Sequence, residues 1–139
     1  MHDYDVRRSI AAAPAVVWSI LTDTAALQDG SFGILKIDGQ IGPGARISIL
    51  SEVSPKRAFP VKVVELVPER LMVWQGGMPF GLFKGVRRFE LREEPGGTTF
   101  RMYEDFSGPL APMIRKSMPD LTATFDKFAD ALKARAEAR

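Results

Sequence analysis

Turn-forming residues divide the middle of the sequence, from residue 32 to residue 106, into short segments. Glycine and proline mark the turns, at Gly39, 42–44, Pro55, 68–70 and 94–97. The segments between them carry the residues typical of strands, at 32–37, 46–49, 61–67, 71–74, 83–91 and 98–106. Turn signals at this density predict six strands of one curved antiparallel sheet.

A further strand and a helix are predicted ahead of this region. Residues 3–10 alternate in polarity as a strand does, with Tyr4, Val6 and Ile10 on one side. Pro14 occupies a position that the first turn of a helix tolerates, and the helix is expected over 15–21. We expect Trp18 to pack this helix on the sheet. Residues 22–30 indicate either a second short helix or a turn.

The C-terminal segment is predicted to be helical. Its apolar side chains recur at steps of four, three and four residues, at Leu121, Phe125, Phe128 and Leu132. A second apolar stripe lies just upstream, at Leu110, Met113 and Ile114. Ser117 and Asp120 have the spacing of a capping box, which would place Pro119 in the first turn of the helix. The pattern fits either one long helix kinked at Pro119 or two helices in sequence.

The order of these elements predicts an α+β fold. One strand, two helical segments, six strands and a long helix make a seven-stranded antiparallel sheet whose apolar face needs a cover. The helix that carries Phe125 and Phe128 is the candidate cover. A curved sheet wrapped on a helix leaves a space between them, which becomes a ligand cavity where side chains do not fill it. The 139 residues suit one domain, 1–139.

Composition excludes several classes of function. With 19 basic and 17 acidic residues and no basic block, the chain does not resemble a nucleic-acid-binding protein. The absence of cysteine excludes disulfides and thiolate catalysis and fits a cytoplasmic location. His2 is the only histidine, so a histidine triad or a histidine-rich metal site is excluded, and no cofactor is expected. The charged N-terminus and the lack of 18 consecutive apolar residues argue against a signal peptide or a membrane span.

Several stretches together resemble a known superfamily. They are IAAAPAVVWSILTD at 10–23, VKVVELVPERLMVWQGG at 61–77, GLFKGVRRFEL at 81–91, EDFSGPLAPMI at 104–114 and SMPDLTATFDKFADALKARAE at 117–137. They are similar to the helix-grip superfamily of START lipid-transfer domains and the birch-pollen allergen, most of all to its bacterial polyketide cyclase/dehydratase-like and activator-of-heat-shock-ATPase-like branch.

This resemblance implies a helix-grip fold and an apolar ligand between the terminal helix and the sheet. It also implies that a minority of members catalyse cyclisation, dehydration or hydrolysis in the same cavity. The chain lacks the glycine-rich loop of the pollen-allergen branch, since residues 42–44 form only a tight turn. It is also shorter than a START domain, which argues against a cavity for a whole phospholipid.

The stretch FRMYEDFSG places a carboxylate in an apolar row. Phe100, Met102, Glu104 and Phe106 share one face of the predicted strand. On the preceding strand Arg87 occupies an equivalent place among Phe83, Gly85, Phe89 and Leu91. A turn centred near residue 96 pairs Arg87 with Glu104 and Phe89 with Met102. We therefore predict a bidentate ion pair on the concave face, because an isolated carboxylate there would be very costly.

Three interpretations of this pair stay open. It is a structural ion pair, an anchor for a carbonyl, hydroxyl or carboxylate of a ligand, or an acid–base group. Trp74 is either a core residue or a stacking surface, and the loop that holds Met78 and Phe80 is either a lid or a plain hairpin turn.

We predict a ligand site that combines this pair with its apolar neighbours: Trp74, Phe83, Arg87, Phe89, Met102, Glu104, Phe106, Met113 and Phe125. The favoured function is binding of a small hydrophobic or aromatic molecule between the terminal helix and the concave sheet. One alternative is a cyclase- or dehydratase-like enzyme that uses Glu104 and Arg87, with Tyr103 or Tyr4 as weaker candidates. Another is a co-chaperone-like module that binds a protein, for which the only support is analogy of fold.

Overall fold

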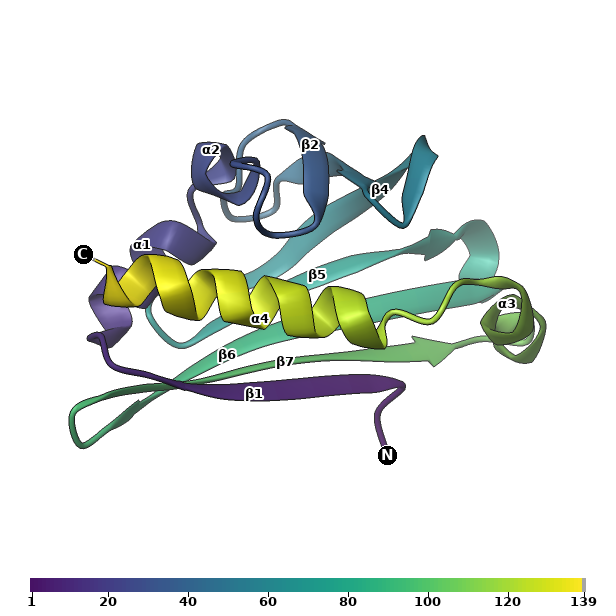
Figure 1. Cartoon of the computed structure of the whole chain (residues 1–139). Helices are drawn as coiled ribbons and strands as arrows, with labels where there is room; N and C mark the ends of the chain where they lie inside the picture. The colour runs from purple at the N-terminus through teal and green to yellow at the C-terminus, as the bar shows by residue number, and fades with distance from the viewer. Residues whose placement is uncertain (139) are drawn as a thin grey trace.

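The computed structural model describes residues 1–138 and contains a seven-stranded antiparallel sheet that curves around a C-terminal helix (Figure 1). The elements in chain order are β1 (Tyr4–Ile10), α1 (Pro14–Leu21), α2 (Thr24–Leu27), β2 (Ile34–Asp38), β3 (Arg46–Ser51), β4 (Ser54–Val67), β5 (Leu71–Met78), the 3₁₀ turn η1 (Pro79–Gly81), β6 (Phe83–Glu94), β7 (Gly97–Ser107), α3 (Ala111–Ser117) and α4 (Thr122–Glu137). The α+β helix-grip architecture predicted from the sequence is confirmed.

Strands β2 to β7 form a continuous meander, and β1 pairs with β7 as the edge strand on that side of the sheet. The spatial order is therefore β1-β7-β6-β5-β4-β3-β2, with antiparallel neighbours throughout. Helix α4 crosses the concave face, and α1 and α2 lie near its C-terminal end (Figure 1). This arrangement places the N-terminal end of α4 near α3 and the start of β1.

The apolar stripes found in the sequence form the core between the helices and the sheet. Pro14 begins α1, and Val17, Ile20 and Leu21 on that helix are fully buried. On α4 the buried residues are Phe125, Phe128, Ala129, Leu132 and Ala136. Burial of one such large side chain contributes about 1.5–3 kcal/mol. Trp18 is partly buried against this core, as expected.

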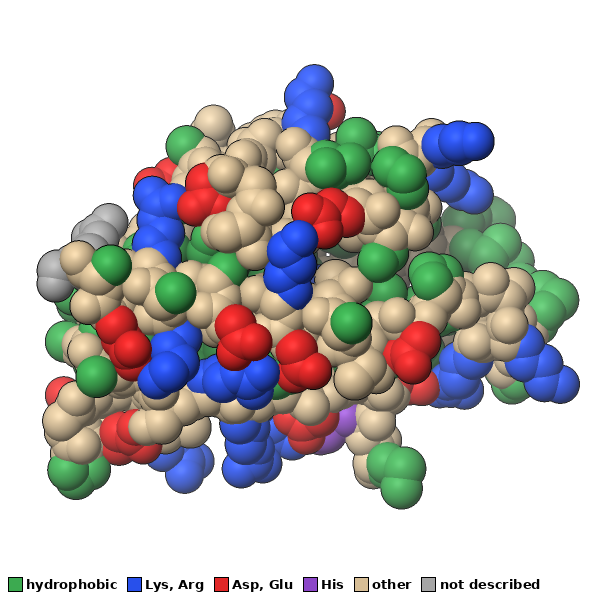
Figure 2. Space-filling model, in the orientation of Figure 1, with side chains coloured by type: hydrophobic (Ala, Val, Ile, Leu, Met, Phe, Trp, Pro, Cys, Tyr) green, Lys and Arg blue, Asp and Glu red, His purple; other side chains and the backbone are tan. Residues whose placement is uncertain are grey.

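Charged side chains line the solvent-facing side of α4 (Figure 2). Arg8 of β1 binds Asp126 and Asp130 at 3.1 and 2.7 Å. On the other side of the helix, Lys127 binds Glu52 of the β3–β4 turn at 2.8 Å. Pairs this exposed contribute at most about 1 kcal/mol each, so they orient the helix while the core holds it.

The C-terminal region consists of two helices, and the predicted capping box is wrong. Ser117 ends α3 and its hydroxyl donates to the Ile114 carbonyl, whereas Asp120 accepts from the Thr122 N–H and hydroxyl. Pro119 lies between the helices and not in the first turn of α4. A proline disfavours helical backbone in the residue before it, and Met118 is accordingly extended, with ψ of 153°.

Strand β4 begins at Ser54 and not near residue 61, as the sequence indicated. Pro55 therefore lies within a strand, where a turn was predicted. The segment from Ser54 to Phe59 pairs only with β3, because β5 joins β4 from Lys62 onward. A strand segment with one unpaired edge is where a sheet tolerates proline.

Candidate functional site

Four neighbouring strands place one residue each in a row across the concave face. The register pairs Tyr4 with Glu104, Glu104 with Arg87 and Arg87 with Trp74, which confirms the predicted Arg87–Glu104 and Phe89–Met102 register. Directly paired residues of an antiparallel sheet point to the same face. The row therefore faces α4, where Phe125 stacks with Tyr4 at 5.3 Å between ring centroids.

Arg87 and Glu104 form an ion pair in this row. The Arg87 Nε donates to Glu104 Oε1 at 2.5 Å, and the two side chains are 24% and 12% exposed. Within residues 1–138 this is the one hydrogen bond of the pair, so it is not the bidentate contact that we predicted. The Arg87 Cζ also lies over the Phe125 ring, 4.6 Å from its centroid, which is a cation–π contact.

Beyond the ion pair, the concave face has no side chains at two paired positions. Gly85 pairs with Gly76, next to the Arg87–Trp74 pair. A Cβ on Gly76 would lie 3.0 Å from the Pro60 carbonyl oxygen, so a side chain does not fit there. A Cβ on Gly85 would make ordinary contacts, at 3.5 Å from the Phe106 ring and 3.7 Å from Glu104 Oε2. The space at Gly76 is therefore taken by Pro60 and Val61, and Gly85 leaves room for about one methyl group beside Phe106 and Glu104.

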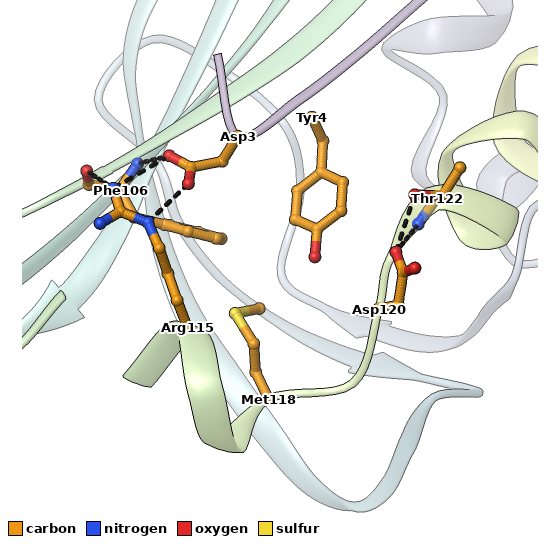
Figure 3. Close-up of a pocket in the computed structure, with 7 residues that line it drawn as sticks. All are labelled: Asp3, Tyr4, Phe106, Arg115, Met118, Asp120 and Thr122. Atoms are coloured by element: carbon orange, nitrogen blue, oxygen red, sulfur yellow. Dashed lines mark hydrogen bonds and ion pairs between the residues drawn. The ribbon is translucent and has the colours of Figure 1, made fainter. Parts of the chain in front are cut away.

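A pocket of about 350 Å³ lies where β1 begins, β7 ends and the α3–α4 linker passes (Figure 3). Its lining residues are Asp3, Tyr4, Phe106, Arg115, Met118, Asp120 and Thr122. This volume is within the range of small-molecule sites. The Tyr4 ring projects into the pocket (Figure 3), and its hydroxyl has no hydrogen bond to any residue of 1–138.

One side of the pocket is held by charge. Arg115 Nε binds Asp3 Oδ1 at 2.6 Å, and the Phe106 N–H donates to Asp3 Oδ2 at 2.8 Å. Arg115 also donates to the Phe106 carbonyl at 2.7 Å. Burial by itself would raise the pKa of Asp3, but the hydrogen bonds from Arg115 and Phe106 outweigh it, and the pKa lies below its ordinary value. Asp3 is therefore an ionised clamp that joins β1, β7 and α3.

Five of the nine predicted ligand-binding residues are buried: Trp74, Phe89, Met102, Phe106 and Phe125. Phe83, Arg87 and Glu104 are partly buried on the same face. Met113 is 60% exposed on α3, so the structure does not bring it together with the others.

Of the nine, Phe106 is the one that lines the 350 Å³ pocket. The region around Phe89 is occupied by aromatic packing, at 4.7 Å from Trp74 and 5.8 Å from Phe128 between ring centroids. The pocket therefore lies at the end of the helix–sheet interface, and Tyr4 and Phe106 separate it from the ion pair.

Sequence reasoning missed most of the pocket lining. Arg115, Met118, Asp120 and Thr122 lie within residues 115–122, and only the fold brings Asp3 to them. Tyr4 was a weak candidate, although the alternation of residues 3–10 already placed it on the inner face of β1.

Trp74 is 3% exposed and its Nε1 is buried without an acceptor within residues 1–138. A buried donor of this kind is uncommon.

The described residues offer no metal site, since no group of three or more His, Asp or Glu side chains among residues 1–138 has suitable geometry. In the same part of the chain, every helix is too short or too polar to cross a bilayer.

Comparisons with known proteins give one family. Residues 1–137 match the family described as polyketide cyclase / dehydrase and lipid transport. No curated protein matches the sequence.

Three similar solved structures share the fold at low sequence identity. An aromatase/cyclase named Zhui from a Streptomyces species has a TM-score of 0.76 at 15% identity, covering 97% of this chain and 93% of that one. A Mesorhizobium loti protein has a TM-score of 0.72 at 20% identity, covering 94% and 93%. A hypothetical protein from Helicobacter pylori has a TM-score of 0.76 at 14% identity, covering 96% and 86%.

Proposed function

The chain belongs to the polyketide cyclase / dehydrase and lipid transport family, and from this premise we propose that it binds a small hydrophobic or aromatic molecule. In this proposal the ligand enters through the pocket at Tyr4 and Phe106 and reaches the Arg87–Glu104 pair behind them. A cytoplasmic location belongs to the same proposal, since a chain without cysteine suits a reducing compartment.

The observation that carries the proposal is the position of the Arg87–Glu104 ion pair. It lies among aromatic rings, directly next to a residue that lines the pocket. Tyr4 lines the pocket and is also the direct register partner of Glu104. Phe125 contacts both Tyr4 and the Arg87 guanidinium. An ion pair this enclosed gives up hydration, which replacement by apolar residues would avoid. Recognition of a polar group on an apolar ligand accounts for its presence.

The surrounding groups fit an aromatic ligand that carries one oxygen. Its ring would pack against the Tyr4 and Phe106 rings that line the pocket, since aromatic pairs favour centroid separations of about 4.5–7 Å. Its carbonyl or hydroxyl oxygen would accept from the Arg87 N–H groups that Glu104 does not use. A gap the size of about one methyl group lies at Gly85, beside Glu104 Oε2.

A comparison of two probes tests this proposal: naphthalene and 2-naphthol, with binding measured by quenching of tryptophan fluorescence. We expect both to bind, and 2-naphthol to bind about tenfold more tightly because a hydrogen bond to a charged group contributes about 1.5 kcal/mol or more. In the double variant Arg87→Met/Glu104→Met the two affinities should become equal.

The matched control is Asp5→Asn/Arg101→Met, which removes an ion pair of 2.8 Å between β1 and β7 on the opposite face of the sheet. It should leave both affinities unchanged. Absence of binding by either probe, or a preference for 2-naphthol that survives the double variant, would contradict the proposal.

A cyclase- or dehydratase-like reaction is the second candidate, and the position of Glu104 favours it. The carboxylate lies beside Arg87, and the Tyr4 hydroxyl, which has no hydrogen bond within residues 1–138, lies at the pocket. A carboxylate base and a phenol donor are the groups that removal of an α-proton and loss of water require. A variant Glu104→Gln that still binds 2-naphthol but no longer dehydrates an aromatic β-hydroxy ketone would establish this role. Equal turnover in the variant would exclude it.

A further inference from the structure

Three apolar side chains are exposed together where β5 joins β6. Met78, Phe80 and Leu82 are 44%, 97% and 38% exposed. We call these three residues the apolar tip. Figure 2 shows hydrophobic side chains gathered at the end of the molecule where β5 meets β6 in Figure 1, with basic side chains on either side. The apolar tip lies outside the pocket and the ion pair described above.

The backbone holds the Phe80 ring in solvent. Phe80 has φ of 61° and ψ of 24°, a left-handed conformation that an aromatic residue rarely adopts. On one side, Gly77 has φ of 137°, and a Cβ there would lie 2.3 Å from the Phe83 carbonyl oxygen. On the other side, the Leu82 carbonyl accepts from the Leu110 N–H at 3.0 Å. Unfavourable backbone geometry that a structure maintains in this way is typical of functional segments.

Basic side chains without acidic partners adjoin the apolar tip. A second hollow, of about 390 Å³, is lined by Met78 and Phe83 together with Arg46, Lys62 and Lys84. None of its lining residues is acidic. The three basic side chains are exposed and make no ion pair within residues 1–138.

Of the other 15 Lys and Arg side chains in residues 1–138, nine pair with an acid, and Arg7, Lys56, Arg57, Arg70, Arg92 and Lys116 do not. Arg8, Arg101 and Arg135 each bind an aspartate at 2.6–2.8 Å. The overall charge is only +2, so an unpaired cluster of three cations makes this end of the molecule distinctly positive.

We propose that the apolar tip docks on an anionic lipid bilayer. Phe80 and Met78 would enter the interface between headgroups and acyl chains, while Arg46, Lys62 and Lys84 would contact anionic headgroups. A second copy of the chain is a poor occupant, because a two-fold contact would bring the same cations face to face. This inference goes beyond the proposed ligand and does not depend on it.

Flotation of the protein with lipid vesicles tests the inference. The vesicles are phosphatidylcholine alone, or phosphatidylcholine with 30% phosphatidylglycerol, each at low and at high salt. We expect partitioning onto the anionic vesicles at low salt, and weaker partitioning at high salt because ions screen the headgroups. Phe80→Ser should lower the partition coefficient about tenfold through loss of apolar burial. Lys84→Glu should lower it at least tenfold through charge reversal.

Two control variants separate the surface from general effects. Arg92→Glu makes the same charge change as Lys84→Glu, at the opposite end of β6 and on an equally unpaired, exposed residue. Leu35→Ser removes a 48% exposed apolar side chain on β2. Both should partition as the wild type does.

Equal partitioning of wild type and Phe80→Ser, or equal loss with Arg92→Glu and Lys84→Glu, would overturn the proposal. Absence of partitioning onto anionic vesicles would also overturn it, leaving an acidic protein surface as the alternative occupant. A sedimentation coefficient that falls in Phe80→Ser would assign the apolar tip to self-association instead.

Discussion

The two ends of α4 lie on the same sheet but are built differently. From its middle to its C-terminal end the helix packs in the apolar core, where Phe128, Ala129, Leu132 and Ala136 are at most 3% exposed. At the N-terminal end Phe125 contacts Tyr4 and the Arg87 guanidinium, beside the 350 Å³ pocket. The C-terminal end of α4 is therefore tightly packed, and we call it the packed end. The N-terminal end adjoins an ion pair and a pocket, and we call it the open end.

Leu132→Ala, at the packed end, should have the largest effect on stability. Leu132 is fully buried, so removal of its side chain should lower the free energy of unfolding by about 3–5 kcal/mol. Urea denaturation measures this change. Binding of 2-naphthol should be unchanged in the folded variant, because the pocket lies at the other end of α4. The control Leu35→Ala, on an exposed residue, should stay within about 0.5 kcal/mol. A loss below about 1 kcal/mol for Leu132→Ala would mean that this end is not tightly packed.

Arg87→Met, at the open end, should rank second. It leaves the Glu104 carboxylate, only 12% exposed, without its partner, and should lower the free energy of unfolding by about 3 kcal/mol. The double variant Arg87→Met/Glu104→Met should recover most of this loss, because it removes both charges. Arg101→Met breaks the more exposed pair on the opposite face and should cost less than about 1 kcal/mol. Equal losses for Arg87→Met and Arg101→Met in urea denaturation would show that the inner pair is hydrated like a surface pair.

The sequence was sufficient to predict the packed end. The spacing of Phe125, Phe128 and Leu132 identified the buried face of α4, because a helix in contact with a sheet repeats its apolar residues every three or four positions. The register of Arg87 and Glu104 was also predictable, because a short hairpin turn fixes which residues of two strands pair.

The open end could not be predicted in the same way. The pocket brings Asp3 next to Arg115, although they are more than 100 residues apart in the sequence. It also contains Met118, which lies in a linker whose path depends on Pro119. Whether Phe89 lines a cavity or fills it depends on the packing of Trp74 and Phe128 around it. The spacing of apolar residues in the sequence predicts which face of a strand or helix a side chain is on. It does not predict how much empty volume remains next to that side chain after packing.

Asp3→Asn should have a smaller, pH-dependent effect. The pKa of Asp3 is lower in the folded protein than its ordinary value near 3.8. Its stabilisation is therefore complete above the unfolded pKa and is lost as the pH falls through the folded pKa. At pH 7 the variant should be about 1–2 kcal/mol less stable than the wild type, since it loses hydrogen bonds to a charged group.

Urea denaturation at pH 7 and at pH 2.5 measures this difference, which should shrink at the lower pH. A difference that is constant with pH would show that Asp3 acts by shape and not by charge. Leu132→Ala is the matched comparison from the packed end, and its loss of stability should not depend on the charge of Asp3.

Phe80→Gly should have the smallest effect, and the opposite sign. Glycine adopts left-handed backbone freely, so the change should raise the free energy of unfolding by about 1 kcal/mol or less, the gain being reduced by the greater freedom of the unfolded chain. Glu69→Gly is the matched control, because Glu69 also has a positive φ, of 64°, in the turn between β4 and β5. Both variants should gain stability in urea denaturation, but only Phe80→Gly should lose partitioning onto anionic vesicles. A gain in Glu69→Gly alone would mean that the Phe80 conformation carries no strain, and the backbone argument for the apolar tip would then fail while its exposure and charge remained.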